Sequence, residues 1–186
     1  MSGRASVAPW QIALLRGVNT GKANRIAMAD LRTLVAGLGF ADARTLLNSG
    51  NVVFRAGRTA PAATAARIEL ALTEKLGVDC RVIVITDSQL ATIVAENPLR
   101  EVAKNPSRLL VAVLGDPGAR AAAASLLERD WSPEALAVGS LAAYLWVPQG
   151  VATSRLNLEV NRALRGNVTG RNWATMLKLA DMVRAD

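Results

Sequence analysis

The sequence predicts an α+β protein made of two ferredoxin-like halves, each an α/β plait of the βαββαβ type, followed by a C-terminal helix. Short apolar runs typical of strands alternate with stretches in which apolar residues recur at helical spacing. The order βαββαβ can be followed once and then again, less completely. Of the 186 residues, 51% are hydrophobic, which is ample for a folded core. We predict a first half over residues 1–96, a connector over 97–107, and a second half with the C-terminal helix over 108–186.

Apolar and β-branched runs predict four strands in the first half. These are residues 9–16, 43–48, 51–56 and 81–85. Ser49 and Gly50 separate the second and third runs, as in a hairpin turn. One helix is expected over residues 28–38, where apolar residues repeat every three or four positions. Another is expected from Pro61, which suits a first helical position, to Gly77, which suits a helix end.

A third helix is expected to begin at Thr86 or Asp87 and to lead into the connector. Two Asn-Pro steps within residues 97–107 predict that connector, because proline ends helices and favours turns. The strands expected in the second half are residues 108–114, 134–138, 141–147 and a minimal 167–169. The helices of this half are expected to follow the caps Asp116, Ser154 and Asn172. No repeated sequence accompanies this repeated order, so the predicted duplication rests on element order alone.

The composition excludes several classes of enzyme. The chain contains no histidine and one cysteine, Cys80. Without histidine there is no imidazole general base, no Ser-His-Asp or Cys-His relay and no histidine metal ligand. A single cysteine excludes an intramolecular disulfide and a thiolate zinc site. We therefore expect no metal site and no cofactor, and a protein that is not an enzyme is favoured.

Charge and hydropathy bear on location and partners. The first ten residues lack the apolar segment of a secretory signal, and no apolar stretch approaches the ~20 residues needed to span a bilayer, so we expect a cytoplasmic protein without a membrane partner. The formal net charge is +7. Residues 1–59 carry eight basic and two acidic side chains, residues 60–150 eight and ten, and residues 151–186 six and three. If the two basic ends meet, they form one positive face; the alternative is charge that only aids solubility.

The loop between the first strand and the first helix, residues 17–25, is the first candidate site. Backbone N–H groups at the start of a helix attract anions. The loop adds the polar and basic side chains of Asn19, Lys22, Asn24 and Arg25. It is not a phosphate-binding P-loop, because only three residues separate its two glycines and alanine, not Ser or Thr, follows its lysine. A glycine-containing turn with solvated charges is the alternative that the sequence leaves open.

Two further polar segments supply the other candidate binding residues. The first is the predicted hairpin turn with Asn48, Ser49 and Asn51, residue types that also serve turns. The second comprises Arg171 and Asn172; the asparagine suits a helix cap, whereas the arginine has no such explanation. Arg16, at the end of the first strand, is a further candidate binding residue. Four side chains at strand ends or helix entrances are predicted to face one common pocket: Arg16, Asn19, Asn51 and Arg171.

Three segments carry a resemblance to a known family. They are residues 13–19 (ALLRGVN), residues 49–54 (SGNVVF), and Arg171-Asn172-Trp173 with Thr175 and residues 177–179 (LKL). With these segments in this order and spacing, the chain resembles the bacterial family called domain of unknown function 1697 over nearly its whole length. The resemblance implies an α+β protein of two ferredoxin-like halves and no known activity. The family loop commonly has glycine where this chain has Lys22 and lysine where it has Ala23, and glutamine is common where this chain has Asn48.

We expect a non-catalytic binding protein whose basic loops hold an anionic ligand or nucleic-acid backbone. The alternative is a small-molecule enzyme or sensor that uses a groove between the two halves. Sequence-specific RNA recognition through the sheet is not expected, because the strand comparable to that of plait RNA readers carries one aromatic residue, Phe54.

Overall fold

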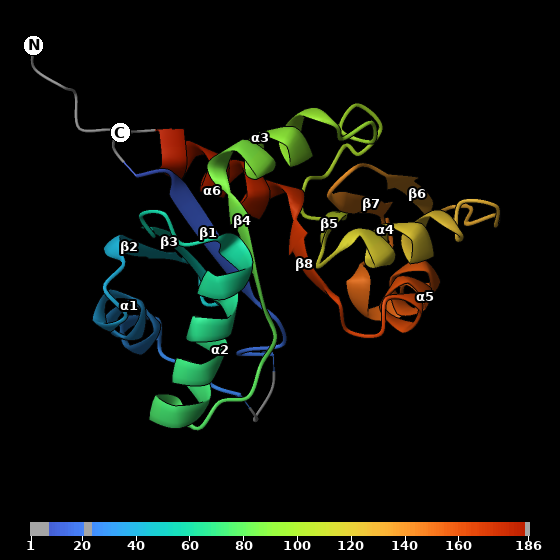
Figure 1. The fold of residues 1–186 in the computed structure, drawn as a ribbon. Coiled ribbons are helices and arrows are strands. Elements are labelled where there is room, and N and C mark those ends of the chain that lie inside the picture. Colours follow the sequence, from blue (N-terminus) through green and yellow to red (C-terminus); the bar gives the residue numbers. More distant parts are fainter. Residues whose placement is uncertain (1–7, 21–23, 185–186) are drawn as a thin grey trace, which may run out of the picture. The chain divides into compact units, whose positions relative to one another are not determined.

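Eight strands and six α-helices make up the fold in the computed structural model, which describes residues 8–20 and 24–184 (Figure 1). The candidate Lys22 lies outside the described residues. Contacts between residues divide the chain into two units, 1–87 and 88–186. The segment 97–107, predicted as the connector, belongs to the second unit. The predicted boundaries stay a prediction.

The first unit contains a four-stranded antiparallel sheet with the strand order β2-β3-β1-β4. Its strands are β1 (Trp10–Leu15), β2 (Ala41–Leu46), β3 (Asn51–Arg55) and β4 (Val82–Thr86). The central β1 pairs on both sides, so that Ile12 lies opposite Val53 of β3 and opposite Ile85 of β4. All four residues Val82 to Ile85 are buried, as the continuous apolar run predicted. The edge strand β2 is interrupted by an irregularity between Ala41 and Arg44.

Helices α1 (Met28–Gly37) and α2 (Pro61–Leu76) pack against this sheet. The core between them includes Ala13, Leu15, Val52, Phe54, Ile68 and Leu72. The rings of Phe40 and Phe54 stack at 5.0 Å between centroids. Burial of each such large side chain contributes roughly 1.5–3 kcal/mol. Helix α2 begins at proline and ends at Gly77 with φ 66°, as predicted.

The second unit repeats the same strand order, β6-β7-β5-β8. Its strands are β5 (Leu109–Leu114), β6 (Ala135–Val138), β7 (Ala142–Trp146) and β8 (Val168–Asn172). Its helices are α3 (Asp87–Ala95), which starts at the unit boundary, α4 (Pro117–Ala124), α5 (Arg155–Ala163), α6 (Trp173–Arg184) and the 3₁₀ turn η1 (Val151–Thr153). The fold class is therefore as predicted: two plait-like halves and a C-terminal helix.

The helices of the second unit follow from their caps and apolar stripes. Asp116 and Ser154 accept hydrogen bonds from the main-chain N–H groups of Ala119 and Asn157, so both predicted caps are confirmed. Helices α4 and α5 share a core with one sheet face that includes Ala123, Leu126, Ala143, Leu145, Leu156 and Val160. On the face away from them, the Tyr144 hydroxyl donates to the Ile93 carbonyl of α3 at 2.8 Å. In the described part of the chain, no helix is long and apolar enough to cross a membrane.

The strand β8 is longer than the predicted segment 167–169. It spans Val168–Asn172 and pairs with β5 over five residues, from Leu110 opposite Asn172 to Leu114 opposite Val168. Its sequence, VTGRN, has β-branched residues only at its first two positions, so pairing with β5 specifies the rest of the strand. At Gly170 the strand lies close to the Leu110 side chain, because a Cβ there would lie 3.2 Å from Leu110 Cδ1.

Candidate functional site

Asn19 fixes the path of the loop between β1 and α1. Its backbone is left-handed, with φ 56°, and its N–H donates to the Asn24 carbonyl at 3.0 Å. Its side-chain Oδ1 accepts from the Ile26 N–H at 2.9 Å, and its Nδ2 donates to the Ile26 carbonyl at 2.9 Å and to the Asn48 carbonyl at 2.8 Å. One half-buried amide thus ties the loop to itself and to the β2–β3 turn.

The β2–β3 turn packs against the end of β1, which brings Asn48 to the loop. Gly50 accepts a hydrogen bond from the Leu15 N–H at 2.9 Å and has φ 71°. A Cβ on Gly50 would lie 2.5 Å from Val18 Cγ2, so only glycine allows this approach. The buried Asn51 closes the turn, because its Nδ2 donates to the Leu46 carbonyl and to Ser49 Oγ, both at 2.9 Å.

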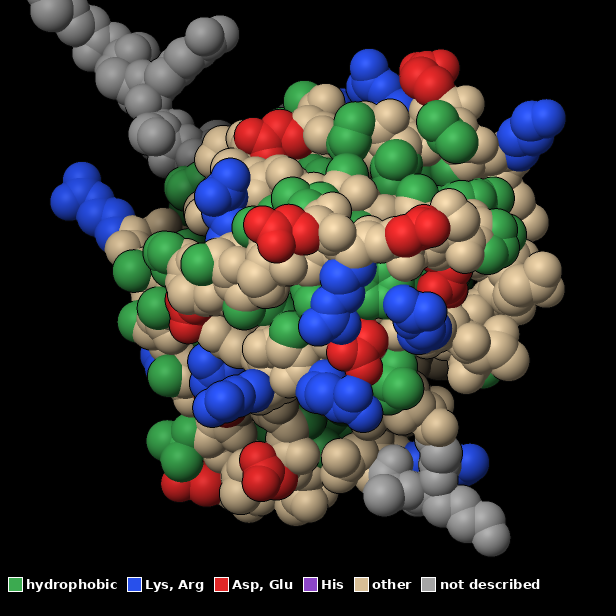
Figure 2. Space-filling model, turned by 90° about the vertical axis from the view of Figure 1, so that its right-hand side faces the viewer, with side chains coloured by type: hydrophobic (Ala, Val, Ile, Leu, Met, Phe, Trp, Pro, Cys, Tyr) green, Lys and Arg blue, Asp and Glu red, His purple; other side chains and the backbone are tan. Residues whose placement is uncertain are grey.

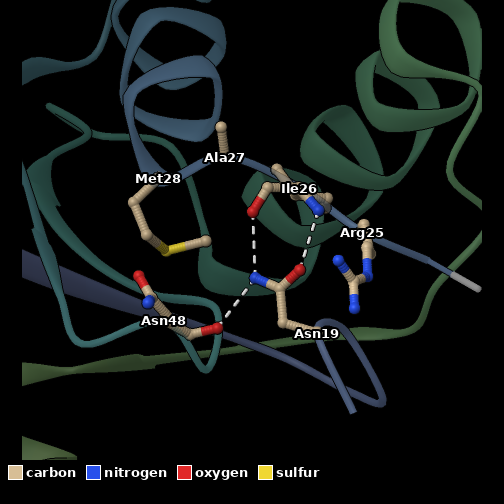
Figure 3. A pocket seen from close by; sticks show the side chains of 6 residues that line it. All are labelled: Asn19, Arg25, Ile26, Ala27, Met28 and Asn48. Carbon is tan, nitrogen blue, oxygen red and sulfur yellow. Dashed lines mark hydrogen bonds between the residues drawn. The ribbon is translucent and has the colours of Figure 1, made fainter. Parts of the chain in front are cut away.

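A cavity of about 420 Å³ lies between the loop and the turn. It is lined by Asn19, Arg25, Ile26, Ala27, Met28 and Asn48 (Figure 3). In this view the Arg25 guanidinium and the Asn48 side chain lie on opposite sides of Asn19, and the Met28 thioether lies above Asn48. Helix α1 starts here after Ala27, which offers no side-chain cap to the first N–H groups. The cavity therefore combines one guanidinium, two side-chain amides and the uncapped start of a helix.

Comparisons with known proteins agree with the resemblance seen in the sequence. Residues 10–144 match the family model described as "Protein of unknown function (DUF1697)". The chain belongs to this family. A comparison with curated proteins finds no match.

A solved structure of similar fold is "the structure of conserved bacterial protein SP0830 from Streptococcus pneumoniae". It shares 19% sequence identity with this DUF1697 chain, with a TM-score of 0.75, and the match covers 94% of this chain and 98% of that chain. At this identity the match shows a common fold and carries no residue roles.

The predicted site residues of the DUF1697 chain fall into two groups. In the first unit, Asn19, Arg25 and Asn48 line the cavity. Asn24, Ser49 and Asn51 lie beside these residues in the same loop and turn, and Arg16 follows β1, where its N–H donates to the Arg81 carbonyl at 2.8 Å.

Arg171 and Asn172 belong to the second unit. Asn172 Oδ1 accepts from the Thr175 N–H and from the Thr175 hydroxyl, both at 2.8 Å, so the predicted cap of the last helix is confirmed. Arg171 is buried; its Nη1 donates to Thr169 Oγ1 at 3.0 Å and to the Gly170 carbonyl at 2.8 Å. Burial lowers the pKa of Arg171 to about 10, so its guanidinium is charged at neutral pH. A pocket shared by Arg171 and the first-unit residues stays a prediction.

The described residues offer no strong nucleophile at the cavity. The one cysteine, Cys80, is buried, and burial, with smaller contributions from Glu69 and Asp79, raises the pKa of its thiol to about 11. It is therefore a neutral thiol at physiological pH. Among the described residues there is also no group of three or more Cys, Asp or Glu side chains that could hold a metal ion.

Sequence reasoning missed the lining residues Ile26, Ala27 and Met28. One signal was available: no Ser, Thr, Asp or Asn stands immediately before Met28, so the first helix had no side chain to cap it. The contact of Met28 with the cavity depends on the backbone path of the loop, which no local pattern encodes.

Proposed function

We propose that this protein is a non-catalytic binding protein that holds a small anionic ligand, one carrying a phosphate or carboxylate group, in the cavity of its first unit. The observation that carries the proposal is the joint presence of the Arg25 guanidinium and the uncapped start of α1 at one cavity. The proposal keeps the expected ligand chemistry and narrows it to a small molecule.

Electrostatics at the cavity favour an anion. Helix α1 has ten residues, and its N-terminus carries a partial positive charge of roughly +0.5. The first N–H groups of a helix bind anions when no side chain caps them. Asn48 adds amide donors, and Arg25 adds a full positive charge with a planar set of N–H groups. Asp30 is the acidic residue in the first turn of α1, and it does not line the cavity.

The lining residues favour binding over catalysis. Asn19, Arg25, Ile26, Ala27, Met28 and Asn48 include no carboxylate, thiol, hydroxyl or lysine amine. General acid–base or nucleophilic chemistry needs at least one such group within hydrogen-bond reach of the substrate. The Asn19 amide already uses both Nδ2 donors and Oδ1 on the main chain. Its role in binding is therefore to hold the other lining groups in place.

Three arginines of the first unit, Arg44, Arg55 and Arg67, pack on aromatic rings, which favours a local ligand over an extended nucleic-acid backbone. The guanidinium carbons of Arg44 and Arg55 lie 4.7 and 4.1 Å from the ring centre of Trp10, and Arg67 lies 4.7 Å from that of Phe40. Arg55 also pairs with Asp42 at 3.3 Å. Figure 2 shows one face of the molecule, on which Asp and Glu side chains lie among the Lys and Arg side chains.

The test is a titration of the whole protein with inorganic phosphate, followed through the NMR signals of the Asn19 and Asn48 side-chain amides. Arg25→Gln should weaken phosphate binding by about tenfold or more, because a charge-assisted contact is lost. Arg32→Gln is the matched control: Arg32 is exposed on α1 and does not line the cavity. This control should bind as the unmodified protein does.

Two results would contradict the proposal. One is a phosphate affinity that Arg25→Gln and Arg32→Gln lower equally. The other is tight binding of a single-stranded oligonucleotide with an affinity that falls steeply with salt. For a single strand, log K falls by about 0.7 per tenfold rise in salt concentration for each phosphate neutralised. A single-anion site should give a far smaller salt dependence.

A further inference from the structure

A second cavity, of about 220 Å³, lies in the second unit and shares no residue with the first. It is formed by the segment before β6 and the segment between β7 and α5, and its lining includes Trp131, Pro133, Glu134, Gln149, Thr153 and Arg155. Pockets for drug-sized ligands have volumes of roughly 300–1,000 Å³. This cavity is smaller, so it suits a molecule no larger than a single amino acid.

Hydrogen bonds hold the walls of this cavity in place. The Trp131 indole Nε1 donates to the Leu126 carbonyl at 2.8 Å, and Trp131 is buried. The Leu156 N–H of α5 donates to Glu134 Oε2 at 2.9 Å, which joins the segment before β6 to the start of the helix. The site is therefore formed before any ligand arrives, which lowers the entropic cost of binding.

Two opposite charges line this cavity without pairing with each other. Arg155 lies with its guanidinium carbon 5.2 Å from the Trp131 ring centre, and among the described residues it forms no ion pair. Glu134 likewise forms no ion pair there, and its Oε1 accepts no hydrogen bond from the described residues. Of the neighbouring charges, Arg129 pairs with Glu159 at 3.1 Å, and Asp130 Oδ1 accepts from the Ser132 N–H at 2.9 Å. The hydrogen bonds from Ser132, with a smaller contribution from the Arg155 charge, lower the pKa of Asp130.

This charge pattern selects the class of ligand. A simple anion that approaches Arg155 is repelled by Glu134, and a simple cation that approaches Glu134 is repelled by Arg155. A zwitterion meets both charges with the correct sign. Trp131 and Pro133 add an apolar surface for the remainder of the molecule.

We propose that this second cavity binds a free α-amino acid with an apolar side chain, its carboxylate on Arg155, its ammonium group on Glu134 and its side chain against Trp131. This site is independent of the anion site in the first unit.

The experiment is calorimetric titration of the full chain with L-leucine, N-acetyl-L-leucine and L-leucinamide. The first analogue lacks the cation and the second lacks the carboxylate, so each removes one of the two charges without changing the protein. L-leucine should show saturable binding, and each analogue should bind at least about tenfold more weakly.

Variants test the same two contacts from the side of the protein. Glu134→Gln keeps an oxygen acceptor for the Leu156 N–H, and Arg155→Met keeps an unbranched stem that packs on the indole. Each should lower the affinity for L-leucine by about tenfold or more. Arg162→Gln is the matched control, because Arg162 lies on the same helix, pairs with Glu159 and does not line the cavity. Arg25→Gln should also leave L-leucine binding unchanged, which separates failure of this site from failure of the anion site.

Three results would overturn the inference: no saturable binding of L-leucine, equal binding of either analogue, or unchanged binding by a folded Glu134→Gln or Arg155→Met protein. If a variant does not fold, as judged by its thermal transition, the two analogues decide the question alone.

Discussion

The side-chain amide of Asn19 donates a hydrogen bond to the main-chain carbonyl of Asn48 at 2.8 Å, across 29 positions of sequence. The same amide makes two further bonds to Ile26. The Asn19 side chain therefore connects the loop that follows β1 to the turn that joins β2 to β3, the two segments between which the cavity lies.

Asn19→Ala should destabilise the protein by about 2–3 kcal/mol. The change removes three side-chain hydrogen bonds, each contributing about 1 kcal/mol, and leaves an alanine in a left-handed conformation. Urea unfolding measures the loss. Thr20→Ala is the control from the same loop. Within the described residues the exposed Thr20 hydroxyl makes one bond, to the Gly17 carbonyl at 3.3 Å, and its loss should cost less than about 0.5 kcal/mol. Equal losses for the two variants would show that Asn19 does not hold the loop.

Gly50→Ala should cost about 2–4 kcal/mol, from the strained φ of 71° and from the clash with Val18. Gly57→Ala separates these two causes: Gly57 has φ 60°, but a Cβ there meets nothing within 4 Å. Gly57→Ala should lower the unfolding free energy by about 1 kcal/mol, the contribution of the positive φ alone. Chemical denaturation measures the unfolding free energy of both variants. Equal losses would contradict the close approach of the turn to β1.

Asn172→Ala should lower stability by about 1 kcal/mol, because the side chain caps α6 through the Thr175 N–H. Asn172→Asp keeps the accepting oxygen and should restore most of the loss. Thermal unfolding of the two variants checks this. An aspartate variant no more stable than the alanine variant would mean that the cap contributes nothing.

Glu96 gives the chain a pH-dependent contact. Its carboxylate accepts hydrogen bonds from the Ser140 N–H at 2.8 Å and from the Ser140 hydroxyl, and these bonds lower the pKa of Glu96. A lowered pKa in the folded state means that the stabilisation is complete above the pKa of the unfolded chain, about 4.3, and is lost as the pH falls through the folded value. The difference in unfolding free energy between the unmodified protein and Glu96→Gln should therefore shrink on acidification. This difference in unfolding free energy should stay below about 1 kcal/mol at every pH, because the Glu96 carboxylate is exposed to solvent. A difference that is constant with pH would contradict the charged contact.

The sequence supported much of the fold because its signals were local. Helix α2 begins at Pro61 and ends before Gly77, as predicted. The predicted caps also hold: helices are capped by Asp116, Ser154 and Asn172. Where local signals were weak, the prediction fell short: β8 carries Gly170 and Arg171, and only its pairing with β5 makes it a full strand.

The site was predictable in part. Asn19 and Asn48 stood out as polar residues of loops, but their hydrogen bond depends on how the turn packs on β1. The cavity near Trp131 gave no sequence signal at all. Trp131, Glu134 and Arg155 come from separate segments, and each is unremarkable in its own local context.

In each sheet the second residue of the first strand pairs with the last residue of the last strand: Gln11 lies opposite Thr86, and Leu110 lies opposite Asn172. A segment with neighbouring ends can be copied, moved or inserted without pulling a strand out of its sheet. We therefore expect that a single duplication of the coding segment for one such unit would yield a second complete sheet. Later substitutions would then replace the repeated residues while the strand order persists.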